Sequence, residues 1–337
     1  MSQQLLDALL TGEPPKQRRA LAKAITLLES TRPDHRAQAD ALLTTLLPHT
    51  GKSFRLGISG VPGVGKSTLI ETLGLYLIDQ GHRVAVLTID PSSSVSGGSI
   101  LGDKTRMEKL SVHPKAYIRP SPSSGTLGGV AEKTREAILV CEAAGYDIVI
   151  VETVGVGQSE TAVHGMTDMF VLMQLPNAGD DLQAIKKGVM ELADLVLINK
   201  ADTNAQAAAQ AQLFISSSLR LLGLHGNPHD PHSANYADYW QPQVLQLSAL
   251  QSQGLDAAWS QMMRFKQLQQ ANGLWEKRRQ GQSLAWMWER INAALLQQFK
   301  SHSQVQKMLP SLTTDVLAGR VAASSAARLL LQQAAST

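Results

Sequence analysis

The sequence predicts an α/β protein in which a mostly parallel sheet is covered by helices, preceded by a helical lead and followed by a helical extension. Three observations predict this class. Short apolar runs alternate with stretches of helical periodicity through the middle of the chain. The runs are continuously apolar, as in strands that are buried on both faces. Strand-like runs are also confined to residues 51–255, with helical patterns on either side.

The first fifty positions are expected to form helices. Apolar residues recur at helical spacing over 5–10 and 18–28, with Pro14 between the two stretches and Pro33 beyond the second. We therefore predict an N-terminal helical segment over residues 1–50.

Residues 51–265 are expected to form the main domain, and residues 266–337 a helical extension. After residue 255 Leu, Met, Trp and Gln recur at helical spacing to the end of the chain. The predicted strands of the main domain lie near 54–59, 84–90, 147–153, 169–175, 195–199 and 244–247.

The run GVPGVGKS fits the pattern G-x-x-x-x-G-K-[ST], and it lies between a predicted strand and a predicted helix. Its glycines allow successive backbone N–H groups to turn toward phosphate oxygens, and the positive end of the new helix faces the same anion. Lys66 is expected to reach the β- and γ-phosphates, and Ser67 to give its hydroxyl to Mg²⁺. The predicted phosphate-binding residues are Gly60, Val61, Pro62, Gly63, Val64, Gly65, Lys66, Ser67 and Thr68. The class predicted is a P-loop NTPase.

The run Asn199-Lys200-Ala201-Asp202 ends another predicted strand and predicts guanine as the base. An Asp carboxylate only accepts hydrogen bonds, and guanine offers it a ring N1–H and an exocyclic amine, a pair that adenine lacks. Asn199 is expected to tie this loop to the phosphate loop, while the stem of Lys200 lies along the base. Backbone N–H groups of Ser248, Ala249 and Leu250, after the last predicted strand, are expected to bind the guanine O6.

Four further residues are candidates for the chemistry. Glu152 ends a predicted strand, where many GTPases carry Asp-x-x-Gly, and we expect it to hold a water on Mg²⁺ while Gly155 offers its N–H to the γ-phosphate. Asp90 and Asp103 flank a Ser/Gly-rich loop and are candidate ligands of Mg²⁺ or its waters; a strand-end turn and an exposed loop charge are their alternative roles. The predicted catalytic residues are Lys66, Glu152, Asp90, Asp103 and Gly155, and the predicted magnesium ligands are Ser67, Asp90, Asp103 and Glu152.

Composition excludes several other classes. The 337 residues carry 31 basic and 28 acidic side chains, a formal charge of +3 without a long basic run, so nucleic-acid binding is not implied. No eighteen apolar residues run together, and the first residues lack a signal core, so we expect no membrane partner. The single cysteine, Cys141, is expected to be a small buried apolar residue of a cytoplasmic protein.

Taken in order, the segments GVPGVGKS, IDPSS, GGSILGDKTRM, ETVGVGQSE, NAGDDLQAIKKG and NKAD resemble the MeaB/ArgK family of P-loop GTPases. The resemblance implies GTP/GDP and Mg²⁺ as cofactors and an adenosylcobalamin-dependent methylmalonyl-CoA mutase as partner. Family members gate cofactor loading and protect or reactivate that mutase. An older label of the family is LAO/AO (arginine/ornithine) transport system kinase. The resemblance also implies a homodimer joined through the C-terminal extension.

The resemblance further implies a third mobile segment over 174–188, in which Asp180 and Lys186 link the nucleotide to the partner. A helix N-cap and a solvated side chain are the alternative roles of these two residues. Val156 follows Gly155 and cannot orient water, so slow hydrolysis completed by a rearrangement or a partner is expected. Two other functions stay open: a metal-insertion GTPase, which the lone cysteine disfavours, and a kinase of a transport protein, for which no catalytic-loop signature is found.

Overall fold

The computed structural model describes residues 3–89, 107–120, 127–153, 159–176, 187–221 and 240–335. The chain divides into two compact units, Met1–Glu276 and Lys277–Thr337. Asp90, Asp103, Gly155, Asp180 and Lys186 lie outside the described residues.

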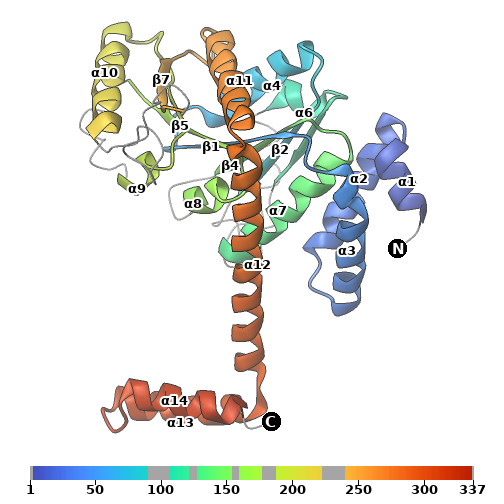
Figure 1. Ribbon diagram of the computed structural model, residues 1–337, viewed down its shortest axis with the longest axis vertical. Coiled ribbons are helices and arrows are strands. Elements are labelled where there is room, and N and C mark those ends of the chain that lie inside the picture. Colours follow the sequence, from blue (N-terminus) through green and yellow to red (C-terminus); the bar gives the residue numbers. More distant parts are fainter. Residues whose placement is uncertain are drawn as a thin grey trace. The chain divides into compact units, whose positions relative to one another are not determined.

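A seven-stranded parallel sheet forms the centre of the first unit (Figure 1). The strand order is β3-β2-β4-β1-β5-β6-β7, and each described pairing is parallel. The strands are β1 (Phe54–Gly60), β2 (Val84–Ile89), β3 (Ala116–Arg119), β4 (Ile148–Thr153), β5 (Met169–Gln174), β6 (Leu195–Ile198) and β7 (Gln243–Gln246). The predicted fold class is confirmed.

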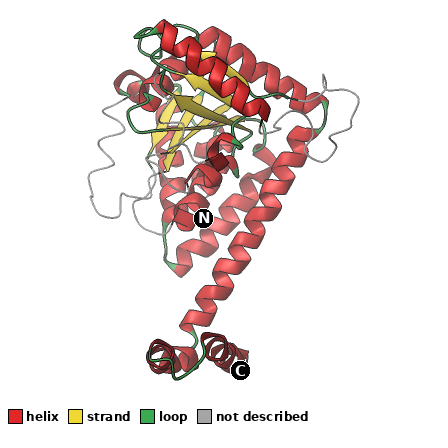
Figure 2. Cartoon of the chain, turned by 90° about the vertical axis from the view of Figure 1, so that its left-hand side faces the viewer, coloured by secondary structure: helices red, strands yellow, loops and turns green. Residues whose placement is uncertain are grey.

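Both faces of the sheet are covered, as the strands enclosed by helices in Figure 2 show. Successive residues of a strand face opposite sides of the sheet. In β4, Ile148 and Ile150 pack in one buried cluster, whereas Val149 and Val151 pack in another. The first cluster includes residues of α4 (Lys66–Asp79), α6 (Glu108–Val112) and α11 (Leu255–Ala271). The second includes residues of α7 (Leu127–Ala143), α8 (Ser159–His164), α9 (Lys187–Met190) and α10 (Ala205–Leu221).

The N-terminal segment is helical and shares the second cluster. It forms α1 (Gln3–Thr11), α2 (Pro14–Glu29), α3 (Pro33–Leu46) and the 3-10 turn η1 (Leu47–His49), and α2 and α3 both begin at a proline, whose fixed φ suits the first turn. The buried amide of Gln17 donates to the carbonyl oxygens of Leu9, at 2.8 Å, and Ala144, at 3.1 Å. This side chain therefore joins α1 and α2 to the loop after α7.

The second unit contains most of α12 (Leu274–Ser301), together with α13 (Ser303–Leu317) and α14 (Ala323–Ala335). Val305, Leu312, Ala326 and Leu330 form its small buried cluster. The division into compact units falls inside α12, at Glu276 and Lys277; the domain limits at 50/51 and 265/266 stay a prediction. No helix among the described residues is long and apolar enough to cross a membrane.

Candidate functional site

The candidate site lies where the strands end at the carboxyl edge of the sheet. The parallel pairing brings the ends of β1, β4, β5, β6 and β7 to one edge. β1 lies between β4 and β5: β2, β3 and β4 lie on one side of it, and β5, β6 and β7 lie on the other. Ligands of open α/β sheets bind at such a topological switch point.

The loop from β1 to α4 takes a shape that requires glycine. Gly60 has a φ of 155°, and a Cβ atom there would lie 2.6 Å from the carbonyl oxygen of Met173. Gly65 has a φ of 97°, and a Cβ atom there would lie 2.5 Å from Nδ2 of Asn199. Helix α4 begins at Lys66 directly after it. The loop is thus pressed against β5 and Asn199, and it leads into a helix N-terminus, which favours an anion.

Lys66 is buried in this loop. Its ammonium Nζ donates to the carbonyl oxygen of Gly60 at 2.8 Å and to that of Val61 at 3.4 Å. Only 9% of the residue is exposed. A positive charge is therefore held between the first residues of the loop and the first turn of α4.

Ser67 and Glu152 form an oxygen pair beside the loop. The Ser67 hydroxyl Oγ lies 3.4 Å from Oε1 of Glu152, which is buried at the end of β4. Next to them, the Thr153 hydroxyl donates to Oγ of Ser59 at 2.9 Å, and both of these side chains are buried. A hydroxyl and a carboxylate oxygen are hard donors of the kind that Mg²⁺ takes, so this pair fits the predicted ion.

Asn199 connects three loops through one buried side chain. Its Nδ2 donates to the carbonyl oxygen of Val64 in the phosphate loop at 2.7 Å. Its Oδ1 accepts from the backbone N–H of Ala249 at 2.9 Å. The predicted tie between the two motifs is thus present in the structure, and it extends to the loop after β7.

Lys200 and Asp202 lie on the exposed side of the same loop. Lys200 has a φ of 61°, uncommon for a residue with a Cβ, and its Nζ donates to the carbonyl oxygen of Gly63 at 2.9 Å. Asp202 Oδ2 accepts a hydrogen bond from Nε2 of Gln251 at 3.2 Å. Leu250, beside Gln251, is 81% exposed. The two motifs predicted from the sequence therefore meet at one place.

Three residues at this edge escaped the sequence analysis: Ser59, Thr153 and Gln251. Thr153 and Ser59 directly adjoin the predicted Glu152 and Gly60, so their position along the chain carried some signal. Gln251 follows the predicted triplet Ser248-Ala249-Leu250, but nothing in the sequence indicates that its side chain turns to Asp202.

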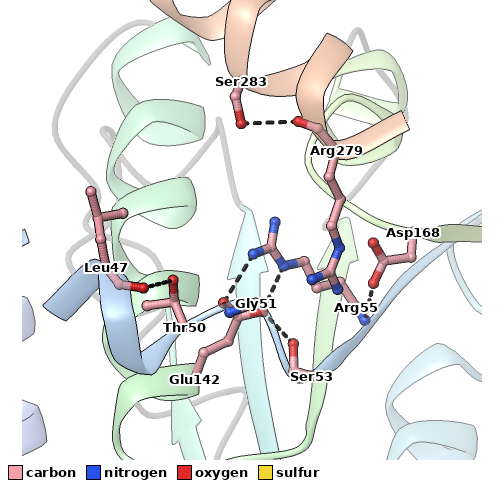
Figure 3. A network of polar contacts seen from close by, with 9 residues as sticks. All are labelled: Leu47, Thr50, Gly51, Ser53, Arg55, Glu142, Asp168, Arg279 and Ser283. Atoms are coloured by element: carbon pink, nitrogen blue, oxygen red, sulfur yellow. Dashed lines mark hydrogen bonds and ion pairs between the residues drawn. The ribbon is translucent and has the colours of Figure 1, made fainter. Parts of the chain in front are cut away.

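The opposite, amino edge of the sheet carries a polar network of another kind (Figure 3). Arg55 donates from Nε and Nη2 to the two carboxylate oxygens of Glu142 at 2.8 and 2.9 Å. The same carboxylate accepts from the Ser53 hydroxyl and from the Gly51 N–H, and Asp168 accepts from the Arg55 N–H at 2.8 Å. Burial alone would raise the pKa of Glu142, but Arg55, Ser53 and Gly51 together hold that pKa below its usual value.

A glycine-rich GVPGVGKS loop that Asn199 joins to the loop after β6, at the carboxyl edge of a parallel sheet, is the arrangement of a P-loop GTPase. The sequence model of the family described as "Methylmalonyl Co-A mutase-associated GTPase MeaB" matches residues 21–304. The chain belongs to this MeaB family of GTPases, which confirms the resemblance seen in the motifs.

Known relatives agree with this assignment. A probable GTPase of Mycobacterium tuberculosis is 50% identical over 328 residues, which cover 97% of this chain and 94% of the relative. The mitochondrial methylmalonic aciduria type A homolog of Mus musculus is 46% identical over 341 residues, covering 98% and 80% of the two chains. The crystal structure of a LAO/AO transport system kinase is 35% identical with a TM-score of 0.76, and the match covers 98% of each chain.

Proposed function

We propose that this GTPase serves an adenosylcobalamin-dependent methylmalonyl-CoA mutase, and that GTP binding and hydrolysis gate loading of the mutase's cofactor or protect and reactivate the mutase. The family description names a methylmalonyl-CoA mutase as the associated protein, and the mouse relative is named for methylmalonic aciduria. The observation that carries the GTP-dependent part is the Asn199 brace, which joins the phosphate loop to the base loop.

Within this proposal the described residues have separate roles. Lys66 and the N-terminus of α4 bind the phosphates, and Asp202 accepts the two guanine donors, with backbone N–H groups of Ser248, Ala249 and Leu250 at the base oxygen. Ser67 and Glu152 hold Mg²⁺, directly or through water. When bound, this ion neutralises charge on the β- and γ-phosphate oxygens.

The remaining predicted roles stay proposals without a described geometry. They are magnesium or water ligation by Asp90 and Asp103, γ-phosphate sensing by Gly155, and partner coupling by Asp180 and Lys186. The cytoplasmic location also stays a prediction.

The most direct test of the proposed function is whether the mutase accelerates an otherwise slow hydrolysis of GTP. Single-turnover hydrolysis of GTP is measured with the protein alone and with saturating mutase. We expect the mutase to raise the rate constant, because Val156, next to Gly155 in the sequence, offers no group that orients water. Fast turnover that the mutase leaves unchanged would contradict the proposal.

Base selection is tested by Asp202→Asn. The amide presents an N–H donor where the carboxylate presents an acceptor, so we expect weaker GTP binding and stronger XTP binding, because xanthine has a carbonyl in place of the exocyclic amine. Nucleotide affinities are measured by fluorescence with labelled analogues. An unchanged preference for GTP over XTP would show that the base assignment is wrong.

We also propose that the chain forms a homodimer through α12. Leu284, Trp288, Ile291 and Leu295 follow one another at steps of four, three and four residues and are 56, 55, 37 and 58% exposed. This is the spacing of a helical seam that packs against a second helix. A second copy of the chain supplies an identical seam, as a twofold interface requires.

Sedimentation of the full chain tests the dimer. Trp288→Glu is expected to shift the protein from dimer to monomer, whereas Gln297→Glu, on the opposite side of the helix by the 3.6-residue period, is expected to leave the dimer intact. A monomeric unaltered protein, or a Trp288→Glu variant that remains dimeric, would refute this interface.

No described observation favours the two alternative functions. Among the residues that the structure describes, no group of three His, Cys, Asp or Glu side chains could hold a metal ion for insertion. Cys141, a residue of α7, is fully buried and is not exposed to an incoming ion. LAO/AO transport system kinase is the name of the solved relative, and that name alone supports the second alternative.

A further inference from the structure

We propose that Gln251 is a positioning residue that orients the carboxylate of Asp202 and thereby sharpens the preference for guanine. The proposal rests on the role of Asp202 proposed above. It goes further because it adds a residue to base selection that lies outside both sequence motifs. The contact that carries it is the hydrogen bond from Gln251 Nε2 to Asp202 Oδ2, 3.2 Å long.

The backbone around Gln251 is held in a tight turn. Ser248 and Gln253 exchange two backbone hydrogen bonds, of 3.1 and 3.0 Å, that close the turn. Inside it, the Gln251 N–H donates to the Ser248 hydroxyl at 3.2 Å. Gly254 continues the turn with a φ of 78°, and a Cβ atom there would lie 2.9 Å from the Gln246 carbonyl oxygen. The Gln251 side chain thus extends from a fixed point.

The backbone of Asp202's loop is fixed as well. The Ala201 N–H donates to the Leu247 carbonyl oxygen at 3.1 Å, and the Asn199 brace lies just before it. The Asp202 carboxylate itself is exposed, and the terminal torsion of an Asp side chain is broad. Among the described contacts, the Gln251 amide is the one that selects an orientation for this carboxylate.

The contact leaves room for the base. An ionised carboxylate has about four acceptor positions on its two oxygens, and Gln251 uses one of them. Three positions stay open for the N1–H and exocyclic amine of guanine. Fixing the carboxylate plane improves a paired interaction more than a single one, because both oxygens must be aligned at the same time.

Comparison of GTP with ITP gives a readout that a merely structural role would not change. Hypoxanthine lacks the exocyclic amine, so ITP offers Asp202 one donor and GTP offers two. We expect Gln251→Ala to weaken GTP binding by about 5-fold, in line with the loss of one hydrogen bond, and ITP binding by clearly less. The dissociation constant of ITP divided by that of GTP is therefore expected to fall.

A matched control lies two positions further along the same turn. Gln253→Ala removes a similar side chain whose backbone, and not its amide, makes the described contacts. It is expected to leave both dissociation constants unchanged. Gln251→Glu puts a like charge beside Asp202, and we expect a larger loss of GTP affinity than with alanine, which added salt reduces.

Four results separate the possibilities. If Gln251→Ala weakens GTP binding and ITP binding equally, the residue only supports the loop. If it weakens neither, the contact does not contribute to nucleotide binding. Either result overturns the proposal. If Asp202→Asn alters the preference between GTP and XTP while Gln251→Ala has no effect, the proposed function stands and this inference alone fails. If Asp202→Asn has no effect on that preference, the base assignment fails first.

Discussion

The two edges of the sheet use polar side chains in opposite ways. At the amino edge, the Glu142 carboxylate receives hydrogen bonds from Arg55, Ser53 and Gly51, so its acceptors are taken up inside the protein. At the carboxyl edge, the exposed Asp202 has a single described side-chain hydrogen bond, from Gln251, and it is 3.2 Å long. Groups that are fully paired within the chain hold the fold together, whereas groups with open positions can bind a ligand.

The two edges therefore predict separable effects of mutation. A change at the amino edge should lower stability and leave nucleotide affinity of the folded protein unchanged. A change at the carboxyl edge should do the reverse. The following experiments test this separation, beginning with the largest expected effect.

Glu142→Gln is expected to lower the free energy of unfolding by about 3–5 kcal/mol, because it leaves the largely buried guanidinium of Arg55 without its charged partner. Thermal unfolding, monitored by circular dichroism, measures the change. The GTP affinity is expected to be unaltered at temperatures below the unfolding transition. Asp34→Asn removes an exposed ion pair with Arg32 and serves as the control, with little change in Tm. A Glu142→Gln variant with normal stability but poor GTP binding would contradict the comparison.

Lys66→Ala is expected to lower GTP affinity and the hydrolysis rate by about 10²–10³-fold, the effect of removing one preorganised charge stabiliser. The Tm of the nucleotide-free protein should change little, because the ammonium contacts backbone carbonyls of its own loop. Affinity is measured by titration and stability by thermal unfolding of the same sample. Lys16→Ala, on the exposed face of α2, is the matched control and should alter neither. A large loss of stability in Lys66→Ala would contradict the predicted separation between the two edges of the sheet.

A smaller effect is expected in the dependence of the unfolding free energy on pH under acidic conditions. The pKa of Glu142 is lowered in the folded protein, so its stabilising contribution is complete above its unfolded value of about 4.5 and is lost as the pH falls through the lower folded value. The difference in unfolding free energy between the unaltered protein and Glu142→Gln should be constant above about pH 5 and should narrow below it. A difference that widens on acidification would show that the sign is wrong.

The smallest expected effect concerns Cys141, next to Glu142. Burial, and to a lesser extent the neighbouring Glu142 charge, raises the pKa of this thiol. We expect no reaction with a thiol reagent at neutral pH in the folded protein, with or without GTP, and full reaction after unfolding. Rapid labelling of the native protein would show that the amino edge opens readily.

Much of the fold could be predicted from the sequence because the sheet is buried on both faces. Each of the six predicted strands is present, with ends that differ by at most one residue. The missed strand, β3, has only four residues, Ala116–Arg119, at the edge of the sheet, where a short run gives little periodicity. The end of the predicted strand 84–90 lies at Asp90, outside the described residues.

The geometry of the candidate site was predictable where one local sequence pattern fixes it. Gly60, Gly65 and Lys66 belong to such a pattern, and Asn199 meets the phosphate loop as expected. The partnership of Arg55 with Glu142 was not predictable, because the two residues are 87 positions apart and neither belongs to a recurring motif. The same holds for Gln251 and Asp202, whose contact depends on how two turns face each other.

The side chain of Asn199 has a consequence for how the chain can vary in length. It reaches Val64 on one side and Ala249 on the other, so three separate turns are held at fixed distances from one amide. An added or deleted residue in any of these turns would pull the amide away from at least one of its two partners. Insertions should therefore be excluded from these three turns and accommodated in other connections of the sheet.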